Sequence, residues 1–300
     1  MKKLLYLIFL LPGLWACCNK QSLDTEAEVV FNLSYNRKLS AHQEVNVNTK
    51  ATANYDVRHI VNVYRADASG TIQNPDGPDY SFSWVGDENS YTASLPQGQY
   101  RVLVWSDYQP SGGPALWNAS DFANISMSGP HTGSDEYVRV YKGDVPLNVS
   151  DSGNRALTIP MDSPMGKFML YSTESPKPDA SGMKARITYT QFMPTSFGMM
   201  LDKPADSQSG VQFTSAIQDT PEGTLLLAYD YVLTNGTESS IPVKLEILDK
   251  SNQVCSSYNF NIPLMRGKLT TVRGEFFSGT SSGSVHVDPE FEGTITVELN

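Results

Sequence analysis

Histidine, cysteine and carboxylate side chains are the groups through which proteins most often bind metals or perform acid–base and nucleophilic chemistry. The four histidines lie far apart in the sequence, and none has a cysteine or carboxylate at metal-ligand spacing: His42, His59, His131 and His286. Lone histidines in strand-like segments are usually structural. The sequence therefore predicts no metal site.

Paired carboxylates could act as general acid and base in a glycosidase. Three candidate acid pairs fall in loop-like or turn-like segments, where carboxylates are normally solvated: Asp87/Glu88, Asp135/Glu136 and Asp288/Glu290. No Gly-x-Ser-x-Gly motif is present, and Met165-Gly166-Lys167 lacks the remaining glycines and the hydroxyl of a phosphate-binding loop. We therefore predict no catalytic residues and no cofactor, and we expect the protein not to be an enzyme.

The residue with the clearest chemistry is Cys17. Two lysines precede an apolar run over residues 4–11, and Ala16 stands directly before Cys17. The run is too short to span a bilayer and has the length of a signal-peptide core. Its end resembles a bacterial lipobox, which implies a signal peptide over residues 1–16, lipidation of Cys17 and a tether over residues 17–27. The alternative is an ordinary signal peptide cut after Ala16.

The charge balance restricts the partners. The formal net charge is −10, with 22 lysines and arginines among 300 residues. Nucleic-acid binding needs a basic face, so we expect no such partner. Anionic lipid headgroups would repel the chain, so attachment to the outer membrane would come from the acyl chains on Cys17.

Cys255 is the only cysteine beyond Cys17 and Cys18, so the fold does not depend on disulfide bonds, and we expect Cys255 to be a small buried residue.

The elements that position these residues are predicted to be strands. Short β-branched and aromatic segments, several of them alternating with polar residues, recur between turn residues along the whole chain, and no segment has a sustained helical period. This rhythm predicts an all-β protein made of β-sandwiches. Pro160 and Pro164 interrupt it, so we expect an N-terminal sandwich over residues 28–160 and a C-terminal sandwich over residues 161–300, with a last strand over residues 294–299.

Aromatic residues suggest an alternative function. Trp105, Tyr108 and Trp117 flank a polar segment rich in glycine, proline, asparagine and serine. If Trp105 and Trp117 were exposed, they could stack on sugar rings, and the protein would be a surface glycan-binding lipoprotein. The competing interpretation is that both side chains belong to the core, where large aromatics contribute most to packing.

Three segments together resemble the Bacteroidetes fimbrillin superfamily, which includes fimbrial subunits and minor or anchor fimbrial lipoproteins. They are Leu95-Pro-Gln-Gly-Gln-Tyr-Arg-Val-Leu-Val-Trp-Ser-Asp107, Pro164-Met-Gly-Lys-Phe-Met-Leu-Tyr-Ser-Thr173 and Ile262-Pro-Leu-Met-Arg-Gly-Lys-Leu-Thr-Thr-Val-Arg-Gly274. The last is followed by a Ser/Gly linker and Val287-Asp-Pro-Glu-Phe291. The resemblance implies two tandem transthyretin-like Greek-key sandwiches and assembly by strand complementation, in which an extended segment of one subunit fills a groove in the next.

The resemblance also points to particular residues. Shaft subunits of the superfamily are cut by a trypsin-like protease where this chain has Arg37-Lys38, so Arg37 is a candidate processing site; the alternative is a basic turn. Ile295, Val297 and Leu299 share one face of a strand and could form a donor strand, or simply the last strand of the second sandwich. We thus expect a fimbrium-related structural or anchoring lipoprotein of the outer membrane and cell surface that supports adhesion, with other fimbrial subunits and a host protein or glycan as partners.

Overall fold

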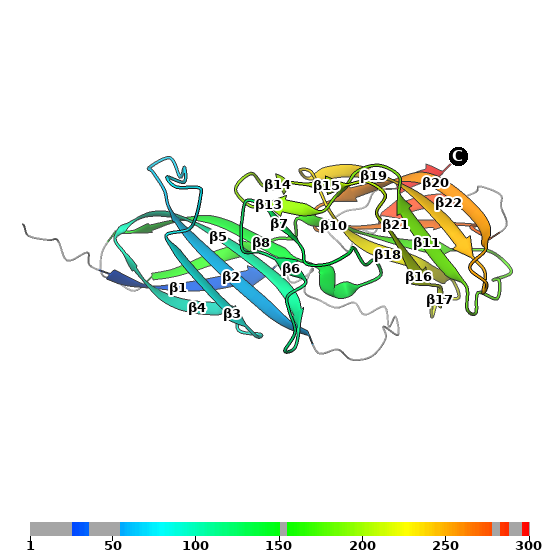
Figure 1. Ribbon diagram of the computed structural model, residues 1–300, viewed down its shortest axis with the longest axis horizontal. Coiled ribbons are helices and arrows are strands. Elements are labelled where there is room, and N and C mark those ends of the chain that lie inside the picture. The colour runs from blue at the N-terminus through cyan, green and yellow to red at the C-terminus, as the bar shows by residue number, and fades with distance from the viewer. Residues whose placement is uncertain (1–25, 36–54, 151–154, 278–282, 288–295, 300) are drawn as a thin grey trace, which may run out of the picture.

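A computed structural model describes residues 26–35, 55–150, 155–277, 283–287 and 296–299, with side chains described up to residue 277. As expected, the fold is all-β. In these residues the only helical element is the short 3-10 helix η1 (Glu136–Val138), and no helix is long and apolar enough to cross a membrane. The molecule is elongated, with β1 (Glu26–Tyr35) toward one end and β20 (Val254–Met265) toward the other (Figure 1).

The first sandwich consists of two sheets. One sheet has the strand order β4 (Ser90–Pro96), β1, β9 (Arg155–Met161). The other has the order β3 (Tyr80–Val85), β2 (Tyr55–Arg65), β5 (Gly98–Pro110), β8 (Tyr141–Val149). Apolar side chains of β1, β4 and β9 pack against those of β2, β5 and β8 in a core that includes Phe31, Leu95 and Val104.

The second sandwich repeats this plan, and one of its two sheets has more strands. Its first sheet has the order β17 (Gln218–Asp219), β18 (Leu225–Leu233), β10 (Met165–Ser172), β21 (Leu269–Gly274), β22 (Gly283–Val287), β23 (Thr296–Leu299). Its second has the order β16 (Gln212–Ala216), β11 (Lys184–Tyr189), β19 (Glu238–Leu248), β20. The core between them includes Phe168, Leu227 and Leu245.

A third cluster, here called the central core, joins the two sandwiches. It combines Leu103 and Trp105, on the outer face of the β2–β5 sheet, with Met169 and Tyr229 on the outer face of the β10–β18 sheet. A small sheet beside it has the order β14 (Lys203–Pro204), β13 (Ser196–Gly198), β7 (Ile125–Met127), β6 (Trp117–Asn118), and β12 (Met193–Pro194) pairs with β15 (Ser207–Gln208). Because this cluster draws on both halves of the chain, the predicted division at residue 160 stays a prediction.

Side-chain burial decides one open question and overturns one expectation. Trp105 and Trp117 belong to the core, as the second of the two interpretations held, with relative accessibilities of 0% and 2%. Both contribute to the central core, because the segment after β5 folds back and covers the outer face of the first sandwich. Cys255 is exposed rather than buried, because it lies at the start of the edge strand β20.

Candidate functional site

The strand β1 is the segment with the clearest functional signature. Its side chains alternate between inside and outside, and the inward set, Ala27, Val29, Phe31 and Leu33, is at most 5% exposed. β1 pairs with β4 antiparallel and with β9 parallel, so its backbone is held on both edges. Burying side chains of this kind contributes roughly 1.5–3 kcal/mol for each large one. Removing β1 would open a hydrophobic groove between β4 and β9.

The last residue of β1 is fixed by a buried polar chain. The Tyr35 hydroxyl donates to Ser106 Oγ at 2.9 Å, and Ser106 Oγ lies 2.9 Å from His59 Nδ1. His59 Nε2 lies 3.3 Å from the Gly86 carbonyl. Because a carbonyl only accepts, Nε2 carries the proton and Nδ1 is the acceptor. The Tyr35 ring also packs edge-on against Tyr141 at 5.2 Å.

Burial sets the protonation of this chain of groups. It lowers the pKa of His59 to about 4, against the opposing effect of the Gly86 carbonyl. It also raises the pKa of Tyr35 well above the ordinary range of a phenol. His59 is therefore neutral near pH 7, as expected for a structural histidine, but its position at the end of β1 was not foreseen.

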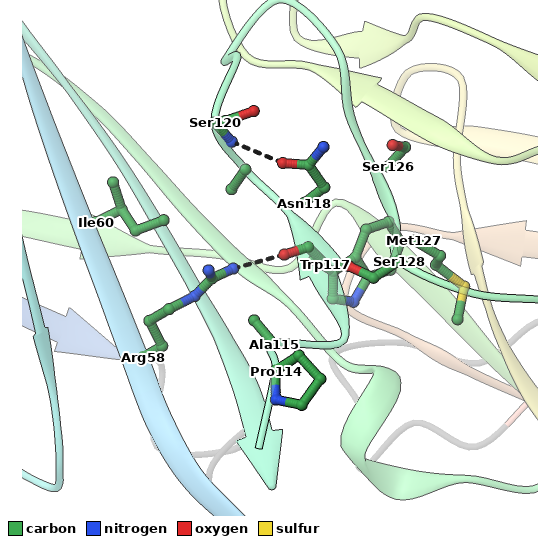
Figure 2. A pocket seen from close by; sticks show the side chains of 11 residues that line it. Arg58, Ile60, Pro114, Ala115, Trp117, Asn118, Ser120, Ser126, Met127 and Ser128 are labelled. Atoms are coloured by element: carbon green, nitrogen blue, oxygen red, sulfur yellow. Dashed lines mark hydrogen bonds between the residues drawn. The ribbon is translucent and has the colours of Figure 1, made fainter. Parts of the chain in front are cut away.

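A shallow cleft of about 590 Å³ lies beside the first sandwich, between β2 and the segment 114–128 (Figure 2). Its lining mixes hydroxyl, amide and guanidinium groups with small aliphatic surfaces: Arg58, Ile60, Pro114, Ala115, Trp117, Asn118, Ala119, Ser120, Ser126, Met127 and Ser128. Ligand sites commonly enclose about 300–1,000 Å³. No charged side chain other than Arg58 is present in this lining.

The charge of Arg58 is compensated inside the protein. Its guanidinium donates to both carboxylate oxygens of Asp107, at 2.9 and 2.5 Å, and to the Trp117 carbonyl at 2.8 Å. Asp107 is fully buried and also accepts from the Trp105 indole at 3.1 Å. Burial raises the pKa of Asp107, while the contacts with Arg58 oppose that effect. The cleft is therefore nearly neutral, and it suits an uncharged polar ligand better than an anion.

Two other groups of titratable side chains link the sandwiches. Lys167 Nζ lies 2.6 Å from Glu136 Oε1 and 4.9 Å from the ring centres of Tyr229 and Tyr231. Burial opposes ionisation of Glu136, but the Lys167 ammonium holds the pKa of that carboxyl below its usual value.

The second group consists of His131, whose Nε2 lies 2.6 Å from Asp230 Oδ2, and Tyr189, whose hydroxyl donates to the same oxygen. The Glu136 and Asp230 carboxylates are each paired within their own group, although the buried Tyr229 hydroxyl has no hydrogen-bond partner in the described part of the chain. Neither group lines the cleft beside β2. Within the described residues, no set of three or more His, Cys, Asp or Glu side chains is arranged to hold a metal ion.

Most of the residues predicted from the lipobox and the fimbrillin resemblance lie outside the described part of the chain. This applies to Cys17, Arg37 and Ile295. Val297 and Leu299 belong to β23, which pairs antiparallel with β22 of the same chain, although their side chains are not described. Their roles stay predictions.

Comparison with known proteins identifies the family. A family model described as a family of unknown function, DUF6562, matches residues 21–300. The chain belongs to this family. No curated protein matches the sequence significantly.

Several solved structures from Bacteroidetes are similar. A candidate polysaccharide-binding protein of the DUF1812 family from Bacteroides thetaiotaomicron is 10% identical, with a TM-score of 0.54 over 91% of this chain and 98% of that one. A candidate cell adhesion protein from Bacteroides ovatus is 12% identical, with a TM-score of 0.51 over 91% and 97%. The fimbrial anchor protein Mfa2 from Porphyromonas gingivalis is 8% identical, with a TM-score of 0.49 over 92% and 100%. At such identities the likeness concerns the fold, and the β-sandwich fold expected from the fimbrillin resemblance is confirmed.

Proposed function

We propose that the protein is a fimbrium-related structural or anchoring lipoprotein of the cell surface, that it supports adhesion, and that it has no enzymatic role. The observation that carries the proposal is the strand β1. It pairs with a neighbouring strand along each of its two edges and buries one face. It lies between the predicted lipidation site, Cys17, and the predicted processing site, Arg37. The similar fold of a candidate cell adhesion protein supports the same function class.

The position of β1 makes two assembly states physically distinct. If Cys17 is acylated and the chain stays intact, β1 connects the lipid directly to the core of the first sandwich, as an outer-membrane anchor requires. If the chain is cut after Arg37, β1 and the lipid leave together, and the vacant groove between β4 and β9 can accept a strand from another subunit by β-augmentation. That strand could be the C-terminal segment with Ile295, Val297 and Leu299.

Mass spectrometry of the N-terminus of the native protein tests the proposal. An acylated Cys17 in material that co-purifies with fimbrial subunits supports an anchor, and a new N-terminus at Lys38 supports a shaft subunit. An R37A/K38A variant is the matched control, because it removes the cleavage site and leaves β1 unchanged. The proposal fails if the intact chain neither polymerises nor co-purifies with such subunits before or after trypsin-like treatment.

A second candidate function is glycan binding, now in the neutral cleft rather than on exposed tryptophans. The mixture of hydroxyl, amide and aliphatic groups in the cleft suits the polar edge and apolar face of a sugar ring, and a candidate polysaccharide-binding protein has a similar fold. Binding of the full chain to a glycan array, lost in N118A/S126A and retained in the control S83A on β3, would support it. An array with no specific signal would exclude it for the sugars displayed.

A further inference from the structure

The long edge strand β20 differs from the other sheet edges of the described residues. It has twelve residues and no charged side chain. The edge strands β8 and β9 carry charged residues, including Asp144 and Arg155, and the uncharged edges β3, β4 and β16 have only six, seven and five residues. Natural proteins usually protect edges by shortness, charge or proline, because an open edge pairs with other chains. β20 lacks charge, and its Pro263 lies near its end.

The open part of β20 is its first two thirds. β19 pairs with one edge of the strand along its whole length, and within the described residues no strand pairs with its other edge. Val254, Cys255, Ser257, Asn259 and Asn261 are exposed. The end of β20 lies against Gly166 of β10, and the Pro263 carbonyl accepts a hydrogen bond from the Thr270 hydroxyl. Near the start of the strand, the Ser256 hydroxyl donates to the Phe276 carbonyl.

The inward side of this edge is also incompletely covered. Tyr258 and Phe260 belong to the margin of the second core and are only half-buried. Their rings pack on Phe276 at 5.2 and 6.3 Å between ring centres. A strand added beside β20 would therefore gain backbone hydrogen bonds, and it would cover apolar surface if its own inward residues were aromatic.

We propose that β20 pairs antiparallel with β20 of a second copy of this chain, forming a two-fold dimer with one continuous sheet. The partner that fits this edge is an uncharged strand with aromatic residues on one face and small polar residues on the other. β20 itself has this pattern, and a two-fold axis places the same surface on both sides of the interface. No charges oppose one another across this pair, since β20 has none. The dimer leaves β1 in place, so it is independent of the proposed strand complementation.

Analytical ultracentrifugation of the full chain in detergent tests the dimer. S257K/N259K places like charges on the exposed side of both copies, and we expect its dimer dissociation constant to rise about tenfold or more. The matched control is Q212K/T214K on β16, which adds the same charges to exposed positions on the opposite edge of the same sheet. We expect less than a twofold change there. Circular dichroism and the melting temperature establish that both variants are folded.

A disulfide experiment tests the pairing geometry. In a C17S/C18S background, Cys255 is the only thiol, and N259C or N261C adds a second one on the same exposed face of β20. The two cysteines of one copy are too far apart on an extended strand to bond with each other. An antiparallel pair predicts a disulfide-linked dimer through Cys255 and the added cysteine of one of these variants.

The results separate this inference from the proposed function. A full chain that stays monomeric at high concentration, or equal effects of S257K/N259K and Q212K/T214K, would overturn β20 pairing whatever the N-terminus does. A dimer with neither acylated Cys17 nor cleavage at Arg37 would retain β20 pairing and argue against the fimbrial role.

Discussion

β1 and β10 occupy equivalent places in the two sandwiches, yet their surroundings differ. Each lies between an antiparallel neighbour, β4 or β18, and a parallel neighbour, β9 or β21. β1 is buried on one face only, whereas seven of the eight residues of β10 are buried, since its outer face contributes to the central core. The same topological position is thus held by one buried face in the first sandwich and by two in the second, so the proposed strand exchange would be far less costly at β1 than at β10. A strand held by one face and two edges can be exchanged without disturbing a neighbouring domain.

The largest expected effect comes from adding a charge to the outer face of each strand. Met169→Asp on β10 puts a carboxylate into the central core, and we expect a loss of about 3–5 kcal/mol in the free energy of unfolding. Val30→Asp on β1 faces outward and should cost about 1 kcal/mol or less. Urea denaturation measures both. Equal losses would contradict the difference between the two strands.

The second effect is a pH dependence specific to the β1 side. The pKa of His59 is 6.5 in the unfolded chain and about 4 in the fold, so the unfolded state binds more protons between these values. The contribution of His59 to stability is therefore full above about pH 6.5 and is lost as the pH drops toward 4, by up to about 3 kcal/mol.

Denaturation midpoints between pH 4 and 7 measure this loss. H59Q should flatten the dependence, at some cost in stability at pH 7, and H131Q is the histidine control. An unchanged slope in H59Q would show that His59 does not govern the acid sensitivity of the first sandwich.

The smallest effect is at the end of β1. Tyr35→Phe removes the hydroxyl that donates to Ser106, and we expect a loss of about 1 kcal/mol. Hydrogen exchange should accelerate in β1 more than in β10, and trypsin-like cleavage at Arg37 should become faster. Tyr171→Phe on β10 is the control, since it removes a phenol hydroxyl, which donates to the sulfur of Met169, from the equivalent strand of the second sandwich. If hydrogen exchange accelerated equally in both strands, the Tyr35–Ser106 hydrogen bond would not be what stabilises β1 locally.

The strand content and the sandwich class were predictable because they depend on local alternation. Val29, Phe31 and Leu33 repeat at every second position, and their inward orientation follows from that period. The burial of Trp105 and Trp117 was one of two interpretations, and the size of these aromatics favoured it. What covers them was not predictable from local patterns. It depends on a segment poor in regular structure folding back over a sheet and meeting the second sandwich.

The candidate site was partly predictable for the same reason. Cys17 and Arg37 were proposed from the lipobox and from the fimbrillin resemblance, and their roles stay predictions. The contact of His59 with the end of β1 joins positions far apart in the chain, and no local pattern signals it. The edge position of Cys255 likewise depends on strand order, which the sequence of β20 does not specify.

The pairing of β1 with β9 has a consequence for the order in which the first sandwich folds. Val29 pairs with Arg155, and Phe31 pairs with Leu157. The first strand of this sandwich in chain order therefore completes its pairing only after the last strand has been made. Contacts of such high sequence separation form slowly, because the intervening loop must first close. During that interval the apolar face of β1, and the apolar side chains on which it will pack, are both exposed to water. If the chain assembles by strand complementation as proposed, it is therefore most open to strand exchange before its first sandwich closes, and the time of assembly would be set by folding as much as by proteolysis.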